Sequence, residues 1–161
     1  MIVMKFGGTS VGTAERIRSL AERVRERLPR QPVVVVSALS GVTDRLILGA
    51  RLAEARDAGW EAVVQEVEER YQAIIAQLFP AGAVAERLRG HVAAILDELR
   101  TFYAGVHNLA ELTPRTLDAI AGMGERLSSE IAAATLAERG LPAQAVAART
   151  VIVTDESFGR A

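Results

Sequence analysis

The chain has 161 residues, half of them apolar, which suits one domain or one lobe of a larger protein with a core of its own. A net charge of −1 gives no reason to expect nucleic acid or an anionic membrane as a partner, and the absence of cysteine excludes disulfides and thiolate chemistry. No apolar run approaches the roughly 20 residues that span a bilayer, and the N-terminus has no secretory segment, so we expect a soluble, cytoplasmic α/β domain.

The first residues combine a short apolar strand with a glycine turn. Residues 2–4 predict a buried strand, Lys5 ends it, and Gly7 and Gly8 follow just before a helical pattern. Glycines let the backbone approach an anion, a helix start presents partly positive amides, and Lys5 would add a full charge. The stretch therefore predicts a phosphate- or anion-binding turn, without the spacing of a Walker A loop. A plain strand-to-helix turn, with Lys5 at the sheet edge, explains the same glycines equally well.

The next segments predict a strand–helix–strand unit. A helix should begin at Thr13 and end at Pro29. Residues 33–36 are four valines, a pattern typical of a strand covered on both faces in a parallel sheet. Small hydroxyl residues and a glycine follow at 37–44, where open α/β sheets usually bind ligands. That segment alone is weak evidence, because Ser, Thr and Asp also simply cap helices.

The rest of the chain predicts mostly helix. We expect helices over 44–58, 60–78 and 84–103, and a loop over 105–111. A fourth helix should start at Thr113 and Pro114, with an interruption at 122–124, and end at 140–142. Two short strands are expected over 143–148 and 151–153, and a loop over 154–161.

Glu125 follows two glycines, Gly122 and Gly124, inside the fourth predicted helix. Each glycine costs about 1 kcal/mol relative to alanine in a helix interior, so the pair needs a reason. Close approach of another backbone or of a ligand would supply one. Glu125 could also be one more charge on a solvated helical face, and spacing alone favours that simpler interpretation.

Three segments together resemble a known family. They are residues 5–11, 34–44 and 124–129, and the stretch 153–161 adds to them. The combination resembles the N-terminal part of an aspartokinase in the amino acid kinase family, in family order and over the whole chain. The resemblance implies an α/β, three-layer amino acid kinase-type fold with a largely parallel central sheet and a helix-rich insertion, of which residues 1–161 would be the N-terminal, aspartate-binding part.

The resemblance also implies an activity. Aspartokinases use ATP to phosphorylate the side-chain carboxylate of L-aspartate, giving 4-phospho-L-aspartate, the first step toward lysine, threonine and methionine. Magnesium is expected as the partner of ATP, whereas no residues of this sequence predict a metal-ligand cluster. His91 and His107, for example, lie far apart and outside any recognisable ligand spacing.

Site residues carry over from the matching motifs. Lys5 would be catalytic, stabilising charge on the transferring phosphoryl group. The residues expected at the ATP phosphates are Lys5, Phe6, Gly7, Gly8, Thr9 and Ser10. Those expected at the aspartate are Ser37, Ala38, Thr43 and Glu125. Glu125 would face the α-ammonium group of aspartate, which would explain a carboxylate flanked by glycine.

The sequence also departs from that family. Aspartokinases continue into a second half of the kinase domain with an ATP-binding segment, and regulatory ACT domains usually follow; these motifs do not occur in this sequence. We therefore expect the chain alone to be inactive. Alternatives are one half of a split kinase, or a non-catalytic module that binds aspartate or an anion or mediates assembly. Residues 37–44 and 124–129 favour aspartokinase over acetylglutamate, carbamate or uridylate kinases. An incomplete sheet predicts a homo-oligomer, association with the missing C-terminal half, or poor solubility.

Overall fold

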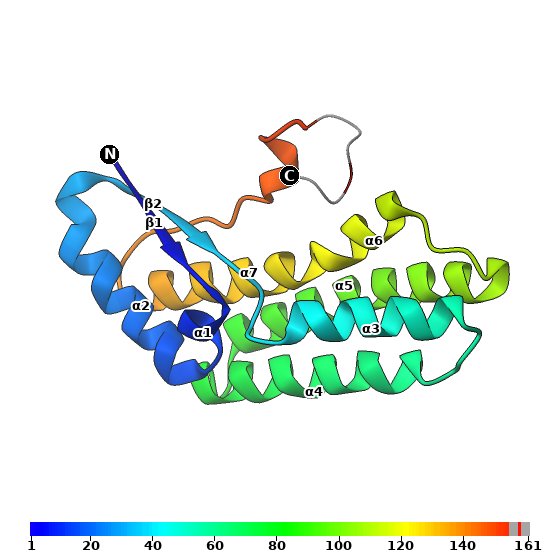
Figure 1. Cartoon of the computed structure of the whole chain (residues 1–161). Helices are drawn as coiled ribbons and strands as arrows, with labels where there is room; N and C mark the ends of the chain where they lie inside the picture. Colours follow the sequence, from blue (N-terminus) through cyan, green and yellow to red (C-terminus); the bar gives the residue numbers. More distant parts are fainter. Residues whose placement is uncertain (155–157, 159–161) are drawn as a thin grey trace.

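A computed structural model describes residues 1–154 and 158 (Figure 1). The strands and the elements between them are β1 (Ile2–Phe6), α1 (Gly8–Val11), α2 (Ala14–Arg27), the 3-10 turn η1 (Leu28–Arg30) and β2 (Pro32–Val36). The remaining elements are α3 (Val42–Glu54), α4 (Trp60–Leu78), α5 (Ala83–Leu109), α6 (Pro114–Ala121), α7 (Met123–Glu138) and the 3-10 turn η2 (Ala148–Thr150). The chain is thus a mostly helical α/β structure, as predicted. No helix in residues 1–154 is long and apolar enough to cross a membrane.

The predicted strand–helix–strand unit is confirmed. β1 and β2 pair in parallel, with Ile2 opposite Pro32 and Phe6 opposite Val36. Thr13 caps α2, because its side-chain oxygen accepts a hydrogen bond from the Arg16 amide at 3.3 Å. The buried face of α2 consists of Ala14, Ile17, Leu20, Ala21 and Val24.

Only one face of the strand pair is covered, which corrects the prediction for residues 33–36. Helices α2 and α7 pack against β2, whereas Val3, Val33 and Val35 are 63%, 48% and 45% exposed. The pairing register places Val3 beside Val33, so these side chains form one apolar surface. The four valines fit a doubly covered strand, but within the described residues nothing packs on their second face.

This uncovered valine face predicts self-association. Exposed apolar surface on a two-stranded sheet favours contact with another chain. We expect the purified chain to elute as a concentration-dependent oligomer in size-exclusion chromatography with light scattering, and the double variant Val33→Thr/Val35→Thr to shift it toward the monomer. The control Val146→Thr changes an exposed valine outside the sheet and should have no effect. A wild-type chain that stays a monodisperse monomer would contradict the prediction.

Helices α3, α4, α5 and α7 form a bundle beside the sheet (Figure 1). At its centre Tyr103 is fully buried, donates a hydrogen bond to the Leu46 carbonyl at 2.7 Å, and meets the Trp60 ring edge-on at 5.7 Å between centroids. Gly49 is required here, because a Cβ on it would lie 2.5 Å from the Tyr103 hydroxyl. The bundle core is therefore fitted around one large side chain.

Two helix boundaries differ from the prediction. Helix α5 continues to Leu109, so the loop expected over 105–111 is wrong. Val106 is buried and extends the apolar face of α5. Gly105 does not interrupt the packing of the helix, because a Cβ on it would have no neighbour within 4 Å. Helix α3 ends at Glu54, before the expected 58, and Asp57 then accepts a hydrogen bond from the Gly59 amide at 2.8 Å in the turn to α4.

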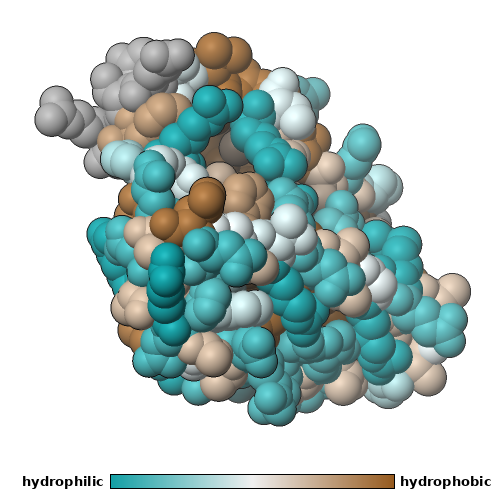
Figure 2. Space-filling view, turned by 90° about the vertical axis from the view of Figure 1, so that its right-hand side faces the viewer, coloured by the Kyte–Doolittle hydropathy of each residue, from teal (hydrophilic) through white to brown (hydrophobic). Residues whose placement is uncertain are grey.

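The two strands expected over 143–148 and 151–153 are also wrong. No strand occurs there in the described residues, and η2 forms instead, with Val151 donating to the Ala148 carbonyl at 3.0 Å. Val151, Ile152 and Val153 are exposed, and Figure 2 shows apolar surface at the top of the molecule, where Figure 1 places this segment. A β-branched pattern forms a strand only where an edge is available to pair with it. Of the loop predicted over 154–161, residues 155–157 and 159–161 lie outside the described residues.

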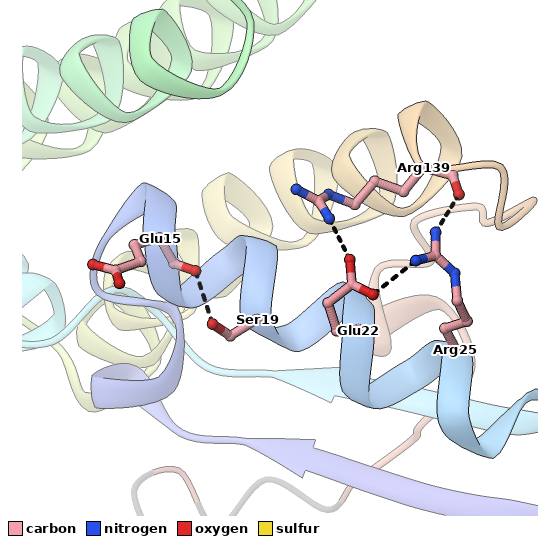
Figure 3. A network of polar contacts seen from close by, with 5 residues as sticks. All are labelled: Glu15, Ser19, Glu22, Arg25 and Arg139. Atoms are coloured by element: carbon pink, nitrogen blue, oxygen red, sulfur yellow. Dashed lines mark hydrogen bonds and ion pairs between the residues drawn. The ribbon is translucent and has the colours of Figure 1, made fainter.

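Polar contacts join helix α2 to the C-terminal end of helix α7 (Figure 3). Glu22 on α2 forms ion pairs with Arg25 and with Arg139, which follows α7, and Arg25 donates to the Arg139 carbonyl at 2.7 Å. All three side chains are partly solvent-exposed, so each pair contributes less than about 1 kcal/mol. The network therefore links α2 to the end of α7 and contributes little to the stability of the fold.

Candidate functional site

The turn after β1 and the loop after β2 pack backbone against backbone. The Ser37 amide donates to the Phe6 carbonyl at 3.0 Å, and the Ser40 amide donates to the Gly8 carbonyl at 3.2 Å. A Cβ on Gly8 would lie 2.9 Å from the Ala38 carbonyl oxygen, which is too close for any side chain. Gly8 is therefore needed for the contact between these two predicted motifs.

Lys5 and Gly7 lie together at the end of β1. The Lys5 side chain is exposed, and its Nζ lies 3.7 Å from the position that a Cβ on Gly7 would occupy. That distance is an ordinary van der Waals contact, so the ammonium group lies directly beside the turn. Phe6 is buried in the core, so only its backbone is available at the turn, whereas Thr9 and Ser10 are exposed on α1.

Glu125 lies against the loop after β2. It occupies the first turn of α7, is half-buried, and its Oε1 accepts a hydrogen bond from the Ala38 amide at 3.3 Å. A Cβ on the preceding Gly124 would lie 2.6 Å from the Ala38 Cβ. Close approach of the Ala38 side chain, and neither a backbone nor a ligand, therefore explains this glycine, and Glu125 does not lie on a solvated face.

The structure brings three of the predicted residues, Gly8, Ala38 and Glu125, together at one junction. Ala38 is contacted by both glycine motifs, through Gly8 and Gly124, and by the Glu125 carboxylate. Thr43 lies in the first turn of α3, half-buried, just after Gly41, whose φ of +79° favours glycine. We name residues 37–41 together with 124–125 the Ala38 junction.

Among the described residues, no other hydrogen bond or ion pair holds the Glu125 carboxylate, so it can accept hydrogen bonds from a ligand.

Three side chains near the Ala38 junction were not predicted. Tyr71 on α4 is fully buried, and its hydroxyl donates to the Gly124 carbonyl at 3.2 Å and lies 3.1 Å from the Ser128 Oγ. Arg70, beside it, has its Nη1 4.0 Å from the position of a Cβ on Gly41. Tyr71 fits the apolar periodicity of its helix, so the sequence offers no signal that separates it from ordinary core residues. Ser128 lies within the motif at 124–129, which does not by itself assign a role to this serine.

Burial raises the pKa of the Tyr71 hydroxyl to about 12. Hydrogen bonds with Ser128 and with the backbone of Leu39 limit the rise, and the nearby Glu125 carboxylate adds to it. The hydroxyl is therefore protonated at neutral pH and acts as a hydrogen-bond donor.

Two hollows lie outside the Ala38 junction. A cavity of about 420 Å³ between α5 and α6 includes Phe102, Val106 and Thr113 in its lining, and none of the predicted site residues is among the described residues that line it. A smaller hollow of about 260 Å³ beside β1 is lined by Lys5, Arg23 and Arg27 among others. Within residues 1–154 and 158, no three His, Asp or Glu side chains converge in an arrangement that could hold a metal ion.

Comparison with known proteins identifies the family. A sequence model described as "Amino acid kinase family" matches residues 1–159. The chain belongs to the amino acid kinase family. Its relatives include the aspartokinase of Chlamydia trachomatis, 35% identical over 160 residues, and the bifunctional aspartokinase/homoserine dehydrogenase 1 of Zea mays, 30% identical over 155 residues. Within the amino acid kinases, this chain is therefore similar to aspartokinases.

Solved aspartokinase structures have the same fold. E. coli aspartokinase III in complex with lysine and aspartate matches 99% of this chain with a TM-score of 0.85 and 26% sequence identity. The same enzyme in complex with aspartate and ADP matches 87% with a TM-score of 0.72 and, at 23% identity, supports the fold alone. The fold class predicted from the sequence is thereby confirmed.

The match covers only part of each relative. This chain spans 33% of the Chlamydia trachomatis aspartokinase, 17% of the Zea mays bifunctional enzyme and 34% of the E. coli aspartokinase III chain. The chain thus corresponds to about a third or less of the known proteins that it resembles.

Proposed function

We propose that this chain is the aspartate-binding part of an aspartate kinase, which transfers a phosphoryl group from ATP to the side-chain carboxylate of L-aspartate and forms 4-phospho-L-aspartate. The observation that carries the proposal is the half-buried Glu125 carboxylate, held 3.3 Å from the Ala38 amide at the junction of both glycine motifs. A fixed carboxylate with spare acceptor capacity suits the α-ammonium group of an amino acid. Aspartate is also a ligand of both solved neighbours.

The aspartate would lie along the loop after β2. Ser37, Ala38 and Thr43 are the neighbours that we assign to it, with Glu125 on its ammonium group. The attacking carboxylate of aspartate is already ionised at pH 7, so the site needs no strong general base. The chemistry therefore depends on the position of the substrate and on positive charge around the phosphoryl group.

Lys5 would supply that positive charge. Its Nζ lies beside Gly7 at the turn, where a phosphate could meet both the ammonium charge and the backbone amides. When ATP is bound with magnesium, it supplies the phosphoryl group; Lys5, Gly7 and Gly8 are the residues of this chain that would hold its phosphates. Thr9 and Ser10 lie exposed beside them on α1.

We further propose that the chain does not phosphorylate aspartate on its own, because it spans only 33% and 34% of the two aspartokinases compared above. A split kinase remains the second candidate. The uncovered valine face of the sheet favours it. Val3 and Lys5 are two positions apart in β1 and both are exposed, so Lys5 lies on the same side of the strand as the valines. A second polypeptide on that face would lie next to the Lys5 ammonium group.

Calorimetry and a turnover assay test these assignments. We expect titration of the chain with L-aspartate to give saturable heat, and incubation with L-aspartate and Mg-ATP to release no ADP. Adding a C-terminal fragment of an aspartokinase relative, cut where its match to this chain ends, should produce ADP release that Lys5→Ala abolishes if the split-kinase candidate is correct. Absence of aspartate binding by a folded chain would overturn the proposed function.

A further inference from the structure

Tyr71 is a buried polar side chain that the proposed function does not yet use. It lies in the middle of α4 and is fully buried, and Ser128 on α7 is 4% exposed. A hydroxyl group removed from water is costly unless it is hydrogen-bonded. Both hydroxyls meet this requirement at one point, the carbonyl of Gly124.

The three groups form a closed triangle. The Tyr71 hydroxyl lies 3.2 Å from the Gly124 carbonyl oxygen and 3.1 Å from the Ser128 Oγ, and the Ser128 hydroxyl donates to the same carbonyl at 3.1 Å. Two hydroxyl protons can satisfy two sides of the triangle at a time, so the carbonyl always has a donor. That carbonyl belongs to the peptide group that joins Gly124 to Glu125, and the triangle therefore fixes the backbone from which the Glu125 side chain extends.

The peptide group that these hydroxyls hold lies directly against the loop after β2. A Cβ on Gly124 would lie 2.6 Å from the Ala38 Cβ, so α7 and the loop are in close contact at this point. The position of this peptide group therefore sets the 3.3 Å contact between the Glu125 carboxylate and the Ala38 amide.

Tyr103 shows what a purely structural tyrosine looks like in this fold. It is as fully buried as Tyr71, and its hydroxyl donates to one backbone carbonyl, that of Leu46, at 2.7 Å. It contacts neither the loop after β2 nor the start of α7 through a hydrogen bond in the described residues. The two tyrosines therefore differ in what their hydroxyl groups join, and not in burial.

We propose that Tyr71, together with Ser128, is a positioning residue of the aspartate site, because its hydroxyl holds the Gly124 carbonyl, in the peptide group before Glu125, and so sets where the Glu125 carboxylate meets the substrate. This inference rests on the proposed function, since it concerns the same site. It adds a fourth segment, α4, to a site that the motifs confine to the turn after β1, the loop after β2 and α7.

The test compares Tyr71→Phe with Tyr103→Phe in the full chain. Each variant removes one buried hydroxyl and keeps the ring, so both are expected to lower the melting temperature. At a temperature where both variants are folded, only Tyr71→Phe should weaken L-aspartate binding in calorimetry, by about tenfold, as the loss of one buried hydrogen bond implies. Only Tyr71→Phe should also shift the amide resonance of Ala38 in the absence of ligand.

The possible outcomes separate this inference from the proposed function. If the wild-type chain binds no aspartate, the proposed function fails. If the wild type binds and Tyr71→Phe binds equally well, or if both tyrosine variants weaken binding equally, the positioning role is overturned. Ser128→Ala provides the second variant should Tyr71→Phe not fold, and it should weaken aspartate binding in the same direction, with a wild-type affinity counting against the proposal.

Discussion

Glu125→Gln is expected to weaken L-aspartate binding by at least about 30-fold. The amide oxygen of glutamine can still accept the hydrogen bond that Glu125 takes from the Ala38 amide, so the junction should keep its geometry. What the variant removes is the negative charge that would face the ammonium group of the substrate. Loss of one partner of a desolvated charge pair costs at least about 2 kcal/mol, which corresponds to that factor in the dissociation constant measured by calorimetry.

Glu130→Gln is the matched control for this experiment. Glu130 lies on the same helix, α7, and forms an ion pair at 3.1 Å with Arg87, which is exposed to solvent. Its charge should contribute little to stability and nothing to aspartate binding. If Glu130→Gln weakened binding as much as Glu125→Gln, the effect would reflect the overall charge of α7, and the assignment of Glu125 to the ammonium group would be wrong.

Gly124→Ala is expected to destabilise the fold, although alanine is the better helix former. The new Cβ would lie 2.6 Å from the Ala38 Cβ, and forcing such a contact in a packed interior costs about 1–3 kcal/mol. The gain in helix propensity is at most about 1 kcal/mol, so the clash prevails. For a chain of this length we expect thermal unfolding to begin several degrees lower, since about 1 kcal/mol shifts the melting temperature by roughly 2–4 °C.

Two further variants show whether the clash is the cause. Gly90→Ala, in the interior of α5, adds a Cβ to open space and should raise the melting temperature slightly. Ala38→Gly, combined with Gly124→Ala, removes the atom that the new Cβ would meet and should restore part of the lost stability. Additive destabilisation by these two changes would show that Gly124 and Ala38 do not limit one another.

The sequence predicts the elements whose signals are local. Thr13 and Pro29 mark the ends of the region that forms α2 and η1, and apolar periodicity finds the helices, because caps and helical faces depend on neighbouring residues. The errors occur where the outcome depends on distant partners. Residues 151–153 have a strand pattern but no strand to pair with in the described residues, and the second face of Val33 and Val35 is uncovered although the pattern suggests burial.

The site was predictable only in part for the same reason. Lys5, Gly7 and Gly8 form a local motif with a physical rationale, whereas Glu125 could be selected only through the resemblance to aspartokinases, since it meets Ala38 across 87 residues. Tyr71 could not be selected at all. Its partners Gly124 and Ser128 lie 53 and 57 residues away, and nothing in a helix pattern distinguishes a tyrosine that holds the start of another helix from one that fills a core.

The central claim is that aspartate binds at the Ala38 junction, and amide shift mapping by NMR during an L-aspartate titration tests it most directly. We expect saturable shifts at residues 37–41 and 124–126, with no shift around the cavity between α5 and α6, for example at Phe102 and Thr113. Shifts confined to that cavity, or a titration that leaves Ala38 and Glu125 unchanged, would contradict it.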